Sequence, residues 1–120
     1  MTPTGQIVSV TELKRAIEGR DAAALIALYT DDAQLCTIDQ DNPPSKPRVL
    51  RGKQAIASYY DDLCGRAMSH HVEAAVTNGD ALSFTQTCIY PNGAKVFCAA
   101  MIETRDGKIV RQTVVQAWDS

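Results

Sequence analysis

The 120-residue chain is predicted to form one α+β domain over residues 1–120, with three N-terminal helices packed on one face of a curved antiparallel sheet. Helical spacing of apolar residues dominates the first half, whereas β-branched and aromatic segments follow in the second. The turns between those segments contain Asn78-Gly79, Asn92-Gly93 and Asp106-Gly107, pairs that supply the positive φ of tight hairpins. The second half should be a meander with strands over residues 72–77, 81–90, 94–104 and 109–118.

The helices follow from start signals and apolar periodicity. Ser9 stands three residues before Glu12, the spacing of a capping box, and Gly19 should end that first helix. Asp21 should cap a second helix whose residues 22–29 are nearly all apolar, so this helix is expected to be largely buried. A third helix is expected over residues 54–65, where apolar side chains make a helical stripe.

Between the second and third helices, the chain predicts a short strand and a loop. Residues 33–39 alternate, with Leu35, Thr37 and Asp39 on one side of the strand. Residues 40–46 contain two adjacent prolines among polar neighbours, which indicates a surface loop.

Composition limits the classes of partner. Hydrophobic residues at 45% and charged residues at 22% are ordinary for a globular domain. A net charge of -2 with scattered Lys and Arg disfavours a nucleic-acid partner. No apolar run is long enough to cross a membrane, and the first ten residues lack the features of a signal peptide. We therefore expect a cytoplasmic protein whose partners are small molecules or proteins, without a membrane partner.

The cysteines and short motifs limit the chemistry. Cys36, Cys64, Cys88 and Cys98 lack C-x-x-C spacing and are expected to be buried free thiols, with a Cys88–Cys98 bridge as the alternative. The sequence contains no glycine-rich phosphate loop, no metal-ligand spacing and no lysine in a context typical of a Schiff base. We therefore expect no metal and no cofactor.

Several segments together resemble one known superfamily. They are residues 21–33, which contain Leu-Tyr-x-Asp-Asp-Ala, residues 51–56, which contain Gly-Lys-Gln-Ala-Ile, and the turns at residues 78–80 and 106–109. They resemble the nuclear transport factor 2-like superfamily, most of all its SnoaL-like branch, which also contains steroid isomerases. The resemblance implies a cone in which the sheet curls around the helices and leaves an apolar cavity open at one end. Reactions in the family occur in that cavity, and dimerisation through the outer face of the sheet is common.

The resemblance also lets the steroid isomerases' machinery be compared with this chain. Those enzymes use a carboxylate base, and a Tyr and a protonated Asp that stabilise the enolate oxygen. The aligned positions hold Thr37 for the base, Leu13 for the Tyr and, approximately, Met101 for the Asp. Ordinary ketosteroid isomerisation is therefore not expected. Asp39, on the same face as Thr37, could place a carboxylate at the cavity mouth, or could simply begin the polar loop.

The only histidines, His70 and His71, precede the first meander strand. Alternation places Val72, Ala74 and Val76 inward, so His70 should point into the cavity and His71 outward. An imidazole there could act as a general acid or base, since histidine side chains titrate near neutral pH. The alternative roles are capping a helix end and packing at a dimer surface.

Strand alternation and the family alignment together predict the cavity-facing residues. The predicted ligand-binding set is Tyr60, Phe84, Gln86, Cys88, Tyr90, Met101, Gln112, Gln116 and Trp118. A buried amide without a partner is costly, so the glutamines should bond each other, water or a ligand, unless they face outward. Tyr59 and Tyr60 are adjacent on the third helix, and we expect only one of them to face the cavity; both could equally be aromatic core filler.

These features predict a protein that binds a small hydrophobic or cyclic metabolite, with cofactor-free isomerase, cyclase or dehydratase-type chemistry. The catalytic candidates are His70, Asp39 and Tyr59. A non-catalytic ligand-binding module and a dimerising interaction module are the alternatives, and a convergent acid–base pair would separate catalysis from binding. A homodimer is expected because the outward residues of the second meander strand offer a flat, weakly charged surface. These residues are Ser83, Thr85, Thr87 and Ile89.

Overall fold

The structure is a computed structural model that describes residues 9–119. Three helices, α1 (Val10–Glu18), α2 (Ala22–Ile26) and α3 (Lys53–Cys64), accompany one six-stranded sheet. Its strands are β1 (Tyr29–Ile38), β2 (Arg48–Arg51), β3 (Ser69–Asn78), β4 (Ala81–Ile89), β5 (Lys95–Arg105) and β6 (Lys108–Trp118). The mixed α+β architecture agrees with the sequence prediction.

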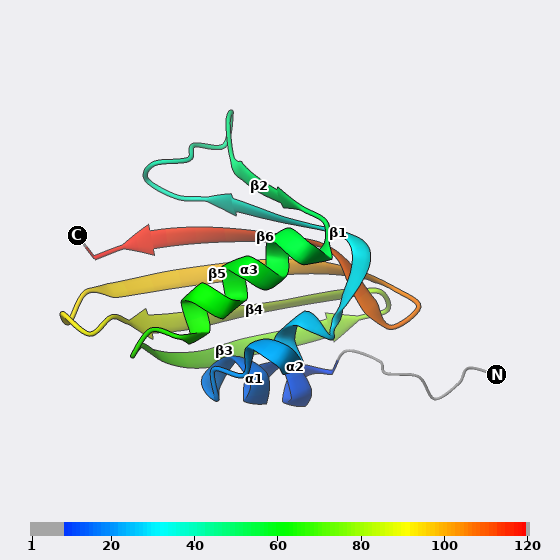
Figure 1. Cartoon of the computed structure of the whole chain (residues 1–120), viewed down its shortest axis with the longest axis horizontal. Coiled ribbons are helices and arrows are strands. Elements are labelled where there is room, and N and C mark those ends of the chain that lie inside the picture. The colour runs from blue at the N-terminus through cyan, green and yellow to red at the C-terminus, as the bar shows by residue number, and fades with distance from the viewer. Residues whose placement is uncertain (1–8, 120) are drawn as a thin grey trace.

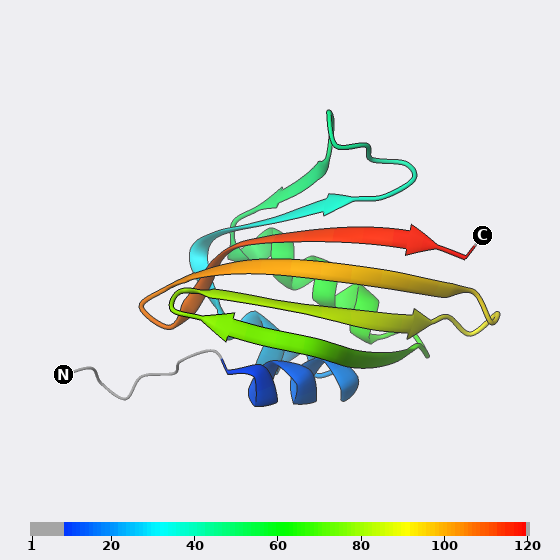
Figure 2. The same cartoon turned by 180° about the vertical axis from the view of Figure 1, so that it is seen from behind.

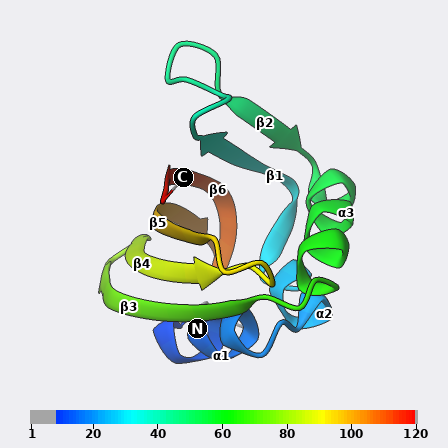
Figure 3. The ribbon, with the colours of Figure 1, turned by 90° about the vertical axis from the view of Figure 1, so that its left-hand side faces the viewer.

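The sheet has the strand order β2-β1-β6-β5-β4-β3, and all neighbours are antiparallel except β1 and β6. The helices α1, α2 and α3 lie on one side of it (Figure 1), and the view from behind shows that none of these three covers the opposite face (Figure 2). Seen from its end, the sheet curls from β3 round to β2, with α3 along the concave side (Figure 3). The sheet is curved and does not close into a barrel.

The helix starts are confirmed, but the second helix is shorter than predicted. The Ser9 hydroxyl oxygen accepts a hydrogen bond from the Glu12 backbone N–H at 3.0 Å, and Asp21 Oδ1 accepts from Ala24 N–H at 3.1 Å. The second helix ends at Ile26, and Tyr29 is instead the first residue of β1, paired with Ile109 of β6. Burial of the Tyr29 ring in the core favours the strand over the helical pattern.

The sheet differs from the predicted antiparallel sheet in three features, the first of which is the parallel pairing of β1 with β6. The four-residue strand β2 pairs antiparallel with β1 after the loop, so the sheet has one more strand than expected. In β3, Ala74 adopts φ 51° at a β-bulge between Glu73 and Val76. The predicted inward orientation of Ala74 and Val76 is therefore wrong: the bulge shifts the alternation by one residue, and Val76 is 63% exposed.

The core lies between the helices and the concave face of the sheet. Its most buried side chains include Tyr29, Leu35, Ile56 and Ile109. A smaller cluster at the other end of the sheet contains Met68 and Val96 together with two buried free thiols, Cys88 and Cys98. Cys36 and Cys64 are also free, and they are half-buried. Within residues 9–119, no helix combines the length and the apolar character of a membrane span.

Candidate functional site

A cavity of about 660 Å³ lies between α3 and the concave face of the sheet. Its exposed lining residues, Arg48, Ser58, Asp62 and Arg66, mark where it opens to solvent. All but one of the predicted site residues line it, namely Asp39, Tyr59, Tyr60, His70, Phe84, Gln86, Cys88, Tyr90, Gln112, Gln116 and Trp118. Their roles in binding or chemistry stay predictions.

Met101 is the exception. On β5, Ala100 and Ile102 are buried against the core, so Met101 between them points to the outer face and is 46% exposed. Its predicted place in the cavity is wrong. The family alignment pointed to residue 101, whereas the inward-facing residues of β5 are its neighbours at positions 100 and 102.

The register arranges the cavity wall in rows across the strands, polar near one end and apolar further along. The polar rows are His70, Cys88, Val96 and Trp118, followed by Gln86, Cys98 and Gln116. The next row, Phe84, Ala100 and Val114, is apolar. A bound molecule would therefore meet amide, thiol and imidazole groups at one end and hydrocarbon at the other.

Next to the apolar row, the buried side chains of Tyr60, Tyr29 and Gln112 are joined in a line by two hydrogen bonds. Tyr29 donates its hydroxyl proton to Gln112 Oε1, and the hydroxyls of Tyr29 and Tyr60 are 2.7 Å apart. Because the Tyr29 proton is directed at Gln112, Tyr60 must be the donor to Tyr29. Burial raises the pKa of both tyrosines, so both stay neutral. Tyr60 can therefore accept a hydrogen bond from a ligand but has no proton left to donate.

Both adjacent tyrosines of α3 line the cavity, contrary to the expectation that only one would. Their rings meet edge-on with centroids 5.1 Å apart, and seven residues of α3 between Ala55 and Cys64 line the cavity, so the lining is wide enough for both rings. Arg48 lies 5.8 Å from the Tyr59 ring centroid, and burial raises the pKa of Tyr59. The Tyr59 hydroxyl takes no part in the Tyr60–Tyr29–Gln112 chain, so of these two adjacent tyrosines Tyr59 is the one that can donate to a ligand.

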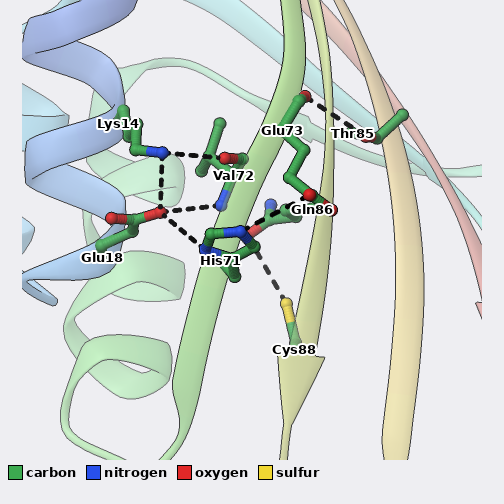
Figure 4. Close-up of polar contacts among 8 residues, drawn as sticks. All are labelled: Lys14, Glu18, His71, Val72, Glu73, Thr85, Gln86 and Cys88. Carbon is green, nitrogen blue, oxygen red and sulfur yellow. Dashed lines mark hydrogen bonds and ion pairs between the residues drawn. The ribbon is translucent and has the colours of Figure 1, made fainter.

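His70 and Cys88 face each other across the β3–β4 pair, with 3.1 Å between His70 Nδ1 and Cys88 Sγ. Cys88 Sγ is also 3.5 Å from Gln86 Oε1, a contact drawn in Figure 4. Hydrogen bonding from Cys98 lowers the pKa of the Cys88 thiol; burial opposes this, and His70 adds to the lowering. The same pairing raises the pKa of Cys98, which therefore remains the protonated partner.

Asp39 is held in the loop after β1. Its Oδ1 accepts hydrogen bonds of 2.9 Å from the backbone N–H groups of Asp41 and Asn42 and from the Asn42 side chain. Burial alone would raise the pKa of Asp39, but these bonds and the nearby Arg48 outweigh it and lower that pKa. A carboxylate so stabilised is a poor proton acceptor, which agrees with the alternative that Asp39 begins the polar loop.

His71 points outward, as predicted, and contacts Glu18 and Glu73 at 3.6 Å each. Figure 4 shows this group beside β3, where Lys14 and Glu18 of α1 bond the backbone of Val72. The group lies outside the cavity lining and has a structural explanation, since it fastens α1 to the edge of the sheet.

Sequence reasoning missed three features of the cavity: the His70–Cys88 contact, the place of Cys98 in the wall, and the bonding of Gln112 to Tyr29. Alternation along the third meander strand could have found Cys98, because Val96, Cys98 and Ala100 share one face. Within residues 9–119, no three His, Cys, Asp or Glu side chains are grouped so that they could hold a metal ion.

Comparison with known proteins places the fold. A family model described as a SnoaL-like domain matches residues 10–112. A nuclear transport factor 2-like protein of unknown function from Mesorhizobium loti has a TM-score of 0.77 at 17% identity, with 89% of this chain and 86% of that chain covered. A proposed ketosteroid isomerase from Kribbella flavida has a TM-score of 0.73 at 14% identity, with 92% and 74% covered.

A third similar structure is SalBIII, an epoxide hydrolase/cyclase-like enzyme in pyran ring formation of the polyether salinomycin. It has a TM-score of 0.70 at 19% identity, with 90% of this chain and 87% of that chain covered. No curated protein matches the sequence significantly. At these identities, the solved structures establish the fold that this chain shares with them.

Proposed function

The chain belongs to the SnoaL-like domain family, and from this we propose that it binds a small, mainly hydrophobic ring compound carrying a carbonyl or hydroxyl oxygen. The observation that supports this is the lining of the cavity, where an apolar row lies beside a row with two amide side chains. Gln86 and Gln116 use their amide oxygens toward Cys88 and Trp118. Their –NH₂ groups are therefore the donors that an oxygen-bearing ligand would meet.

The only tryptophan provides the measurement. Trp118 lines the cavity and stacks at 5.2 Å from Tyr90, so a ligand should change its emission. We propose titrating 1-tetralone and tetralin, bicyclic compounds that differ in one carbonyl. Gln86→Leu should weaken the binding of 1-tetralone by roughly 1–3 kcal/mol and leave the binding of tetralin nearly unchanged. Gln34→Leu, outside the cavity lining, is the matched control. Unchanged emission with both compounds would contradict the proposal.

Cofactor-free proton transfer is a second candidate, favoured by the His70 imidazole in the cavity lining. His70 would remove a proton beside a carbonyl, the first step of isomerase, cyclase or dehydratase-type reactions, with Tyr59 as a donor to the oxygen. In D₂O, the protein should speed deuterium incorporation at the α carbon of 1-tetralone, and His70→Gln should abolish the increase. Exchange that persists in His70→Gln would exclude His70 as the base.

The protein is further proposed to form homodimers through the outer sheet face, which carries exposed apolar side chains between threonines and serines. A non-catalytic interaction module would use the same face. The cytoplasmic location expected from the sequence stays a prediction.

A further inference from the structure

One group of cavity residues has a chemistry that ligand binding does not require. Cys88 is only 6% exposed yet lines the cavity, and His70 Nδ1 lies 3.1 Å from its sulfur. His70 comes from β3 and Cys88 from β4, and the register holds them directly opposite each other. A thiol beside an imidazole can pass its proton to the ring and become a thiolate, the nucleophilic form of cysteine.

The surroundings of Cys88 differ from those of the other two cavity cysteines, Cys98 and Cys64: the pairing with Cys88 raises the pKa of Cys98. Hydrogen bonding from Cys98 and the nearby His70 lower the pKa of Cys88. Cys64 of α3 also lines the cavity, but burial raises its pKa, and its charged neighbours include Asp21 and Asp61. Cys36, half-buried on β1, lies outside the cavity lining. The chain therefore contains its own controls for thiol reactivity.

We propose that Cys88 is a nucleophilic site that forms a covalent thioether with α,β-unsaturated carbonyl compounds entering the cavity, with His70 as the proton carrier. The inference deepens the proposed function and rests on it, since the electrophile is a ring compound with a carbonyl. Gln86 and Gln116 occupy the next row, where their amide N–H groups can bond the carbonyl oxygen.

The step is balanced without any further reactant. The Cys88 thiol turns its proton from Gln86 Oε1 to His70 Nδ1, the S–H bond breaks, and the proton moves to the ring nitrogen. The sulfur electron pair forms a bond to the β carbon, and the π electrons of the C=C bond move to the α carbon and the carbonyl oxygen. The enolate, stabilised by amide donors, then takes the proton from the imidazolium at its α carbon, which returns His70 to neutral.

A disulfide with Cys98 is the competing use of Cys88, and the register disfavours it. Cys98 is paired with Gln86, and Cys88 with Val96, so the two cysteines are diagonal neighbours. Diagonal neighbours on antiparallel strands are typically about 7–8 Å apart, beyond the usual Cα separation of a disulfide. Both thiols are free in the structure.

The test uses the whole chain and chalcone, an enone with two aromatic rings, with peptide mapping by mass spectrometry over time. Cys88 should gain one chalcone mass roughly tenfold or more faster than Cys64 or Cys36. His70→Gln should slow the reaction of Cys88 with chalcone by about tenfold or more without changing the reaction rate of Cys36. His71→Gln, which changes the outward histidine, should leave all rates unchanged. Because wild-type cysteines are compared within one chain, this result does not depend on a variant folding.

Dihydrochalcone, which lacks the reactive double bond, separates this inference from the proposed function. It should change Trp118 emission and slow the labelling of Cys88. If it binds while Cys88 reacts no faster than Cys36, the nucleophilic site is wrong and the binding function stands. If Cys88 reacts rapidly but dihydrochalcone neither binds nor protects, the thiol site is supported and the binding function is contradicted. An unchanged Cys88 rate in His70→Gln would overturn the role of His70.

Discussion

The Tyr29 hydroxyl connects three elements of the fold through one atom. Tyr29 begins β1, donates to Gln112 of β6 and accepts from Tyr60 of α3, and its side chain is 1% exposed. This chain satisfies three polar groups that would otherwise be costly to bury. It also fixes Tyr60 and Gln112 where they line the inner end of the cavity.

Replacing Tyr29 by Phe should lower the free energy of unfolding by roughly 1–3 kcal/mol, because the Tyr60 hydroxyl and the Gln112 oxygen lose their shared partner. Urea denaturation measures the change. Tyr59→Phe is the matched control, because the Tyr59 hydroxyl is not part of the hydrogen-bonded chain. This substitution should lower the free energy of unfolding by less than about 1 kcal/mol. Equal losses in the two variants would mean that the hydrogen-bonded chain adds no stability.

The sequence predicted part of this arrangement. The placement of Gln112 on the inner face followed from strand alternation together with the family resemblance, and the cost of a buried amide predicted that it would have a partner. The partner itself was not predictable, because the helical pattern of residues 22–29 placed Tyr29 in the preceding helix. The glutamines do not bond each other: Gln112 bonds Tyr29, and Gln116 bonds Trp118.

At the scale of elements, α1 covers the exposed edge of the sheet. β3 is an edge strand, and Lys14 Nζ donates to Val72 O at 3.0 Å while Glu18 Oε2 accepts from Val72 N–H at 2.8 Å (Figure 4). Unpaired backbone groups on an edge strand invite pairing with another chain. Side chains from α1 therefore both fasten the helix and block this part of the edge.

This contact should make stability depend on pH. The Val72 N–H lowers the pKa of Glu18; burial opposes this, and Lys14 and His71 add to the lowering. A carboxyl with a lower pKa in the folded state adds stability above its unfolded pKa and loses it as pH falls through the folded value. Near neutral pH, Glu18→Gln should therefore have its unfolding midpoint at a lower urea concentration than the wild type. The difference between the two midpoints should shrink near pH 3.

Glu103→Gln is the control for that comparison, since Glu103 is exposed on β5 and its removal should leave the urea midpoint nearly unchanged at both pH values. A gap between wild type and Glu18→Gln that is as large near pH 3 as near neutral pH would exclude the carboxylate charge as its cause.

The bulge at Ala74 decides which histidine enters the cavity. Between the bulge and the β3–β4 turn, Val76 pairs with Ser83. If that register continued along β3 without the bulge, His71 would lie opposite Cys88. The extra residue moves the pairing by one, so His70 is opposite Cys88 instead.

The Gly-containing turns predicted the meander well, because their positive φ is a local requirement. A bulge at an alanine has no such local signal, so neither it nor the His70–Cys88 contact could be predicted.

Ala74→Gly should stabilise the protein by up to about 1.5 kcal/mol. The positive φ of 51° costs an L-residue roughly 1–2 kcal/mol, and glycine's greater freedom in the unfolded chain takes back about 0.5–1 kcal/mol. Ala75→Gly, the neighbour without positive φ, should instead destabilise by about 0.5–1 kcal/mol or more. Thermal or urea unfolding of the two variants measures this, and a destabilised Ala74→Gly would show that the bulge carries no strain.

At the scale of the whole molecule, no helix of residues 9–119 lies over the outer face of the sheet (Figure 2). The sequence predicted a flat, weakly charged face from four residues of β4, and the structure adds larger apolar groups from β5 and β6. Phe97 is 51% exposed, Met101 46% and Val115 39%. The helices and the meander were predictable because apolar periodicity and turn residues are local patterns, and the curl of the sheet was implied by the family resemblance. The association of copies depends on surface matching that no local pattern encodes.

Light scattering at micromolar concentration should give a mass twice the 13.0 kDa of one chain. A specific dimer needs about 800 Å² from each partner, a small part of the 7015 Å² accessible surface of the chain. Phe97→Lys should give monomers, because a two-fold axis repeats every interface residue and so buries two added charges in one contact. Ala23→Lys adds the same charge on α2, on the helical side of the sheet, and should leave the mass unchanged. A mass of 13.0 kDa for the unaltered chain would contradict the dimer, and the exposed Phe97 would then need another partner to explain it.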